Sequence, residues 1–223
     1  MEETTRIRMT PRRRADELAS RLALRYPDAP CALEAGGDPW KLLVMARLSA
    51  QCTDERVNLV SVDLFRKFPT CRHMAEGELS EIENCIRSCG LFRGKAKSIK
   101  EASQIICEKY EGRVPDTMEE LLSLPGVGRK IANLILGDVY GKGGIVADTH
   151  CIRICGRVGF YEEGMNDPLK CERIMEKLVD RNEQSLFCHR IVLFGRDVCM
   201  ARNPQCDACP MADICKHNKL RKK

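Results

Sequence analysis

Apolar side chains recur every three or four residues along most of this chain, which is the spacing of amphipathic α-helices. The segment from Trp40 to Ser49 is apolar on nearly every face and predicts a central buried helix. No segment shows the alternating pattern of a β-strand. The chain is therefore predicted to be all-α. The other predicted helices cover residues 11–24, 54–68, 80–88, 96–110, 149–156, 168–181 and 185–195, and a turn is predicted over 90–94.

One break between two helical patterns has an unusual composition, Leu124-Pro-Gly-Val-Gly-Arg-Lys130. Pro125 ends the first helix, and the two glycines permit positive φ in the turn. The backbone N–H groups of Gly126, Val127 and Gly128 can then reach an anion at the N-terminus of the second helix. The segment is either an ordinary helix–helix turn or a grip for one phosphate of a nucleic-acid backbone.

Length and composition describe a globular chain of one large or two small domains, with 223 residues, 43% hydrophobic and 31% charged. The net charge of +5 permits a polyanionic partner without requiring one. No apolar run approaches the roughly 18 residues of a membrane span, and no signal peptide is evident. A cytoplasmic protein is expected. Basic residues gather at both ends of the chain, at Arg6, Arg8, Arg12, Arg13, Arg14, Lys216, Lys219, Arg221, Lys222 and Lys223.

Four of the fourteen cysteines lie close together at the C-terminus, with six, two and five residues between them. They are Cys199, Cys206, Cys209 and Cys215. Such a compact thiol set in an intracellular protein predicts a zinc site or an iron–sulfur cluster, and the spacing does not choose between the two. The remaining cysteines are interpreted as packed thiols, namely Cys31, Cys52, Cys71, Cys85, Cys89, Cys107, Cys151, Cys155, Cys171 and Cys188.

Two charged residues at predicted helix starts are candidates for catalysis. Lys130 is either an amine nucleophile or a contact to phosphate or solvent. Asp148 opens the helix at Asp148-Thr-His150, where it is an N-cap, a catalytic carboxylate, or both if one oxygen caps and the other faces a cavity. The connection over residues 141–146 is short enough to bring Asp148 beside Lys130. An amine beside a carboxylate can perform covalent chemistry at an electrophilic carbon.

Three ordered motifs resemble the endonuclease III family of helix-hairpin-helix DNA glycosylases with a [4Fe–4S] cluster. They are the segment 124–130, Val146-Ala-Asp-Thr-His150 and the cysteine spacing, supported by Leu48-Ser-Ala-Gln-Cys-Thr-Asp54 and Gly90-Leu-Phe92. The resemblance covers roughly residues 12 to 217. It implies two helical lobes with an active-site cleft between them. A six-helix barrel-like domain over 32–142 carries the hairpin, at about 124–130, and residues 1–31 with 143–223 form the iron–sulfur domain.

The resemblance also implies an activity, which is removal of an oxidised or otherwise damaged pyrimidine followed by strand cleavage. Lys130 corresponds to the family's nucleophile, Asp148 to its catalytic carboxylate, and the four C-terminal cysteines to its cluster ligands. Gln51 and Leu91 correspond to the residues that fill the gap left by a flipped base. The partner is double-stranded DNA with a damaged base or an abasic site, bound by a monomer. Further contacts to DNA are Gly126, Val127, Gly128, Arg129 and Arg202, and the pocket includes Asp54 and His150.

Some alternatives stay open on the sequence. Adenine-mismatch relatives lack this lysine and carry a catalytic glutamate in the helix before Gln51, whereas residues 40–51 contain no acidic residue. A pyrimidine-dimer or mismatch-specific glycosylase, or a non-enzymatic metal-stabilised DNA-binding module, remains an alternative. Asn203 and Gln205 are neutral in a loop that is usually basic in the family, and Leu122 stands where some members carry a glutamate.

Overall fold

The computed structural model describes residues 9–221, and within that range it contains helices and no β-strand. The prediction of an all-α chain is confirmed. Arg6, Arg8, Lys222 and Lys223, which belong to the basic ends of the sequence, lie outside the described residues. Across residues 9–221, every helix is too short or too polar to cross a membrane.

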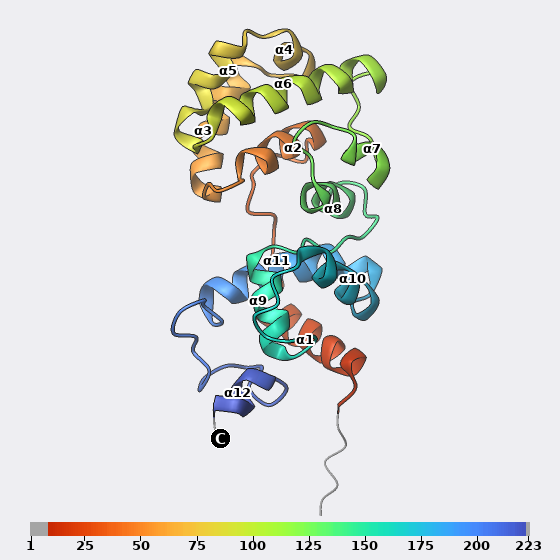
Figure 1. The fold of residues 1–223 in the computed structure, drawn as a ribbon, viewed down its shortest axis with the longest axis vertical. Coiled ribbons are helices and arrows are strands. Elements are labelled where there is room, and N and C mark those ends of the chain that lie inside the picture. The colour runs from red at the N-terminus through yellow and green to blue at the C-terminus, as the bar shows by residue number, and fades with distance from the viewer. Residues whose placement is uncertain (1–8, 222–223) are drawn as a thin grey trace, which may run out of the picture. The chain divides into compact units, whose positions relative to one another are not determined.

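The chain divides into two compact units, and the first of them spans Cys31–Lys142. Its centre is α2, most of whose side chains are buried, as its apolar sequence predicts. The indole Nε1 of Trp40 in this helix donates a hydrogen bond of 3.0 Å to Ser103 Oγ, which satisfies the one polar atom of that ring. The helices of this unit are α2 (Pro39–Leu48), α3 (Asp54–Lys67), α4 (Cys71–Glu76), α5 (Leu79–Ile86), η1 (Arg87–Cys89), α6 (Phe92–Lys109), α7 (Met118–Leu122) and α8 (Arg129–Asp138) (Figure 1).

The second unit joins Met1–Pro30 to Gly143–Lys223, of which residues 9–30 and 143–221 are described. In this unit α11 contacts both α1 and α9, and its buried Phe187, Ile191 and Phe194 form the centre of the core. The helices are α1 (Pro11–Arg25), α9 (Thr149–Val158), α10 (Pro168–Leu178), η2 (Arg181–Glu183), α11 (Gln184–Asp197) and α12 (Lys216–Arg221) (Figure 1).

Local sequence accounts for most helix starts. Proline occupies the first helical position of α1, α2 and α10, and in each case the preceding residue is a side-chain N-cap, Thr10, Asp38 and Asp167 respectively. The helix α3 likewise begins after Thr53, whose hydroxyl accepts from the Arg56 N–H. These starts agree with the sequence pattern because a proline and a capping oxygen act within one turn of the chain.

Three helical segments differ from the expectation. The predicted turn over 90–94 is wrong in its second half, because α6 already begins at Phe92 and the Lys95 N–H donates to the Leu91 carbonyl. Gly94 therefore lies inside the first turn of a helix. The short helices α4 and α12 were not predicted, since six residues are too few to display a helical period.

Candidate functional site

The hairpin between α7 and α8 is fixed to the core of its unit by the buried side chains of Leu124 and Val127. Gly126 has φ +78°, which favours glycine, and a Cβ at this position would lie 2.5 Å from Arg47 Nε and 2.9 Å from Ser98 Cβ. Both the backbone conformation and the close approach of α2 and α6 therefore require glycine here. The hairpin is a rigid part of this unit rather than a loose connection.

The amide groups of the hairpin are not all equally available. The Val127 N–H donates to the Leu124 carbonyl at 3.1 Å inside the turn, whereas the N–H groups of Gly126 and Gly128 have no acceptor among the described residues. Gly128 has φ −100° and is the N-cap of α8 without a side-chain cap, so only Gly126 of the two glycines uses the positive φ that glycine permits. Two open amide donors thus accompany the positive end of a helix.

Lys130 is the second residue of α8, as predicted, and its side chain is exposed. Within residues 9–221 its amine has no hydrogen bond or ion pair. The neighbouring Arg129 is half-buried. An amine at the positive end of a helix gains nothing from the helix dipole, so its position is not explained by stability.

Asp148 is the N-cap of α9, and its two oxygens make different contacts. Oδ1 accepts from the Cys151 N–H at 2.7 Å, and Oδ2 lies 3.2 Å from His150 Nδ1. The side chain is 16% exposed. The helix N-terminus and the amide hydrogen bond both favour the ionised carboxylate. The capping role is therefore real, and the second oxygen points toward a titratable ring rather than toward the helix.

The ring of His150 is held by a glycine that the sequence analysis did not identify. A Cβ on Gly195 of α11 would lie 2.5 Å from His150 Cδ2 and 2.9 Å from Arg153 Nη2. The two helices α9 and α11 pack closely at this point because position 195 has no side chain. Such a requirement depends on two segments distant in sequence, so a single glycine in an apolar helix gives no signal of it.

Gln51 and Leu91 share a backbone feature. Both are non-glycine residues with positive φ, +55° and +45°, and both are exposed, Leu91 to 66%. This left-handed conformation is rare for a bulky residue such as leucine. Asp54 is half-buried at the first residue of α3, three positions after Gln51.

The four C-terminal cysteines line one common pocket of the second unit, as a shared ligand would require. Arg157 of α9 is next to them, with Nη1 3.4 Å from Cys199 Sγ and its carbonyl 3.3 Å from Cys215 Sγ. Burial, with the neighbouring thiols adding to it, raises the pKa of Cys209 to about 11 and also raises the pKa of Cys215. Four thiols converging on one pocket beside a cation fit a metal cluster, whose positive charge would offset the crowding of thiolates.

Two groups of contacts hold this cysteine segment to the rest of its unit. Arg157 donates to the carbonyls of Met200 at 2.7 Å and Ala201 at 3.0 Å, which fixes the loop that presents exposed Arg202. Arg21 of α1 donates to the Pro210 carbonyl at 2.7 Å and forms an ion pair with Asp213. Neither arginine was identified from the sequence, because each is one basic residue on an ordinary helix face.

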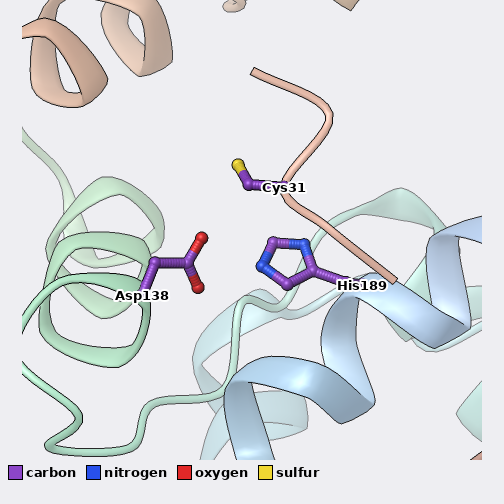
Figure 2. Close-up of side chains that lie close together, drawn as sticks. All are labelled: Cys31, Asp138 and His189. Carbon is purple, nitrogen blue, oxygen red and sulfur yellow. The ribbon is translucent and has the colours of Figure 1, made fainter. Parts of the chain in front are cut away.

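Most of the other cysteines are free thiols buried in the protein core, where several of them contact one another. Cys151 Sγ lies 4.0 Å from Cys155 Sγ and 3.9 Å from Cys171 Sγ. Cys31 is half-buried beside Asp138 at the end of α8, and burial raises the pKa of its thiol to about 12 (Figure 2). His189, also drawn in Figure 2, belongs to α11 in the other unit.

Comparisons with known proteins agree with the motifs. A model of the HhH-GPD superfamily of base excision DNA repair proteins matches residues 44–181. A model of the iron–sulfur binding domain of endonuclease III matches residues 199–215, which begin and end at the outer two of the four cysteines.

Relatives and solved structures match over nearly the whole chain. Endonuclease III of Synechocystis sp. is 42% identical over 216 residues, which cover 96% of this chain and 97% of the relative. Endonuclease III of Escherichia coli K12 is 35% identical over 204 residues, 90% of this chain and 94% of the relative. A solved endonuclease III, trapped with DNA as a covalent intermediate, matches with a TM-score of 0.88 and 38% identity over 96% of this chain and 100% of that one. The chain therefore belongs to the endonuclease III family.

Proposed function

We propose that Lys130 is the nucleophile with which this chain excises damaged pyrimidines from double-stranded DNA and then cleaves the strand. As a member of the endonuclease III family, the chain is a base-excision DNA glycosylase with abasic-site lyase activity. The observation that carries the assignment of Lys130 is its exposed, unpartnered amine directly after a hairpin with two open amide donors. That combination leaves the amine available to a sugar while the adjacent phosphate is held.

The proposed chemistry begins at the sugar C1′. The lone pair of Lys130 Nζ forms a bond to C1′ as the bond from C1′ to the base breaks, and the base leaves with a proton. The sugar ring opens to a Schiff base, which makes the C2′ proton acidic. Loss of that proton expels the 3′ phosphate by β-elimination. Hydrolysis of the Schiff base then releases Lys130 and the product.

We propose that Asp148 stabilises the positive charge that develops on the sugar and helps to take a proton from the Lys130 amine. The N-cap contact at Oδ1 supports this role because it keeps the carboxylate oriented and favours its ionised form. His150, next to Oδ2, and Asp54 are proposed to contribute to the base pocket.

DNA binding is proposed to use contacts that read no sequence. The open amides of Gly126 and Gly128 hold a phosphate, with Val127, Arg129 and Arg202 adding to the DNA-binding surface. Gln51 and Leu91 fill the gap left by the extruded nucleotide, a role that suits two exposed side chains on constrained loops.

The chain carries the [4Fe–4S] cluster of its family, and we propose Cys199, Cys206, Cys209 and Cys215 as its ligands. When bound, the cluster ties together a segment that buries little apolar surface of its own. In this proposal, residues 32–142 form the six-helix domain that carries the hairpin, and residues 1–31 with 143–223 form the iron–sulfur domain. We further propose that the protein acts as a monomer in the cytoplasm. Pyrimidine-dimer and mismatch-specific activities, and a purely structural DNA-binding role, are not favoured by its relatives.

Borohydride trapping on a duplex with one thymine glycol tests the assignment. The wild-type protein is expected to give cleaved strand and, with borohydride, a covalent adduct. Lys130→Ala is expected to give neither, whereas Lys97→Ala, which removes an exposed lysine on α6, is expected to behave as wild type. An undiminished adduct in Lys130→Ala would remove Lys130 from the mechanism. Parallel duplexes with 5-hydroxycytosine, dihydrouracil, an abasic site, a pyrimidine dimer and an A:G mismatch rank the substrates.

A further inference from the structure

Lys95 is fully buried, with 0% exposure, and the chemistry above does not use it. It lies in the first turn of α6, in the same unit as the hairpin. Its amine donates two hydrogen bonds of 2.8 Å, one to the Leu48 carbonyl and one to the Cys89 carbonyl. A buried lysine is costly because burial disfavours its charge, and the same burial lowers its pKa. The contacts of a buried lysine must offset this cost, so they indicate a specific role for the residue.

The two carbonyls that Lys95 contacts mark the ends of two helical segments. Leu48 is the last residue of α2 and lies three residues before Gln51, and Cys89 is the last residue of η1 and lies two residues before Leu91. Carbonyls at a helix C-terminus lack partners in their own helix and carry partial negative charge. One ammonium therefore satisfies both segment ends at once and joins the loop of Gln51 to the loop of Leu91.

A second contact between these loops lies beside Lys95. Burial, with the neighbouring Cys52 thiol adding to it, raises the pKa of Cys89 to about 11. The backbones at Gln51 and Leu91 both have positive φ, which persists only where surrounding contacts enforce it. The Lys95 contacts to Leu48 and Cys89 are tertiary contacts of this kind, because they lie within three residues of Gln51 and Leu91.

The same turn of α6 also contacts the hairpin. Ser98 Oγ donates to the Lys95 carbonyl at 3.0 Å and accepts from Arg47 Nε at 2.9 Å. Arg47 in turn is the side chain that lies against Gly126. Residues 95–98 thus connect the loop of Gln51, the loop of Leu91 and the phosphate-binding hairpin within one unit.

We propose that Lys95 is a positioning residue for base extrusion, which sets the separation of Gln51 and Leu91 so that both enter the DNA stack together. This inference rests on the proposed role of those two residues in filling the gap. Lysine suits the position because its ammonium is a compact charge with several donors on a flexible stem. An apolar side chain of the same length would fill the space but leave both carbonyls unsatisfied, and the loops would separate.

The test compares Lys95→Met with Lys100→Met. Lys100 is a matched control, because it lies on the same helix and its amine also donates to a carbonyl, that of Gly77 at the end of α4, which belongs to neither loop. Single-turnover excision of thymine glycol is measured on duplex and on single-stranded DNA, and extrusion is followed by 2-aminopurine placed next to the lesion. Lys95→Met is expected to slow excision from the duplex about 10-fold or more and to reduce the 2-aminopurine signal. On the single strand, where no stack must be filled, both variants are expected to stay within about 2-fold of wild type.

Several results would overturn the inference. Equal slowing of Lys95→Met on duplex and single strand would reduce Lys95 to general support of the fold, and wild-type behaviour on the duplex would remove its role. If Lys95→Met does not fold, Lys95→Gln, which retains one donor group, replaces it in the comparison of duplex with single-stranded DNA. Its excision from the duplex is expected to be slowed less than that of Lys95→Met. Lys95→Met in a Leu91→Ala background is expected to slow duplex excision less than it does alone, and full additivity would contradict the proposal.

Gln51→Ala and Leu91→Ala separate this inference from the proposed function. If both slow excision from the duplex and Lys95→Met does not, the inference fails while the role of the two residues stands. If neither slows excision, the gap-filling role itself fails.

Discussion

The helices α8 and α9 each begin beside a charged residue, and the two starts are built in opposite ways. Lys130 at the start of α8 is exposed, without a partner among residues 9–221, and at a helix end that repels its charge. Asp148 at the start of α9 is largely buried, bonded through both oxygens, and at a helix end that attracts its charge. One side chain is left without a hydrogen bond or ion pair in that range, and the other is held in place by its contacts.

This difference shows for which of the two positions the stability of the helix explains the residue type found there. The N-cap contact of Asp148 accounts for an aspartate at that position without any catalysis. The packing of α8 does not account for a lysine at position 130, and its proposed role in catalysis does. The comparison therefore predicts that substitutions at Lys130 change activity alone, whereas substitutions at Asp148 divide between activity and stability according to what replaces the carboxylate.

The largest effect is expected from Lys130→Arg, which keeps the positive charge at the start of α8 but removes the reactive amine. If charge were the role of Lys130, lyase activity would survive. We expect lyase activity and borohydride trapping to be lost, because the guanidinium remains protonated and does not form a Schiff base. DNA affinity, measured by fluorescence anisotropy on an abasic-site analogue, is expected to stay within about 3-fold of wild type. Retained trapping would show that another amine performs the reaction.

Asp148→Asn is expected to produce the next largest effect, a fall of about 10²- to 10³-fold in single-turnover base excision. Asparagine caps a helix about as well as aspartate, so the free energy of unfolding is expected to change by less than about 0.5 kcal/mol. Quench-flow measurement of excision and urea unfolding of the same sample separate the two quantities. Unchanged excision would leave Asp148 as a cap only.

Gly195→Ala is expected to have a moderate effect on excision, through His150. A methyl group at position 195 would lie 2.5 Å from His150 Cδ2, so the ring must shift and its contact with Asp148 Oδ2 must change. We expect excision to slow about 3- to 10-fold, because small misplacements near the reacting atoms are costly. The control is Gly164→Ala, which strains a loop glycine of φ +94° but has open space around it, so that it tests the effect of lost stability without contact to His150. If Gly195→Ala excises at the wild-type rate, the orientation of His150 does not matter.

The smallest expected effect is the loss of the cap itself, isolated by comparing Asp148→Ala with Asp148→Asn. Both variants lose the carboxylate, but only alanine loses the hydrogen bond from the Cys151 N–H. We expect Asp148→Ala to be less stable than Asp148→Asn by about 1 kcal/mol in urea unfolding. Equal stability of the two variants would show that the capping contact contributes nothing.

Much of the fold could be predicted because its signals are local. Pro39 after Asp38 begins α2, and Asp148 begins α9, through contacts within one turn of the chain. The start of α6 could not be predicted in this way, since Leu91 is an N-cap without a capping side chain and Gly94 resembles a turn residue. The missed start matters, because it left Lys95 outside the predicted helix of 96–110, whereas the structure places it on the buried face of α6.

The residues that support the proposed site could not be identified from the sequence, for a related reason. The Nζ of Lys95 donates hydrogen bonds to the carbonyls of Leu48 and Cys89, which are 47 and 6 residues away in the sequence. Every residue has a backbone carbonyl, so the sequence does not show which ones will accept such a bond. The fit of Gly195 against His150 likewise joins α11 to α9. Motifs identify residues that meet the substrate, whereas residues that hold them in place depend on tertiary contacts.

The most direct test of the central claim is the identity of the residue that carries the trapped sugar. The wild-type protein is reduced with borohydride on abasic-site DNA, digested with nuclease and trypsin, and sequenced by mass spectrometry. We predict that the sugar remnant lies on Lys130, in a peptide that begins at Lys130 and runs to Lys142 because modification blocks cleavage at Lys130. A remnant on any other amine, with Lys130 unmodified, would contradict the account.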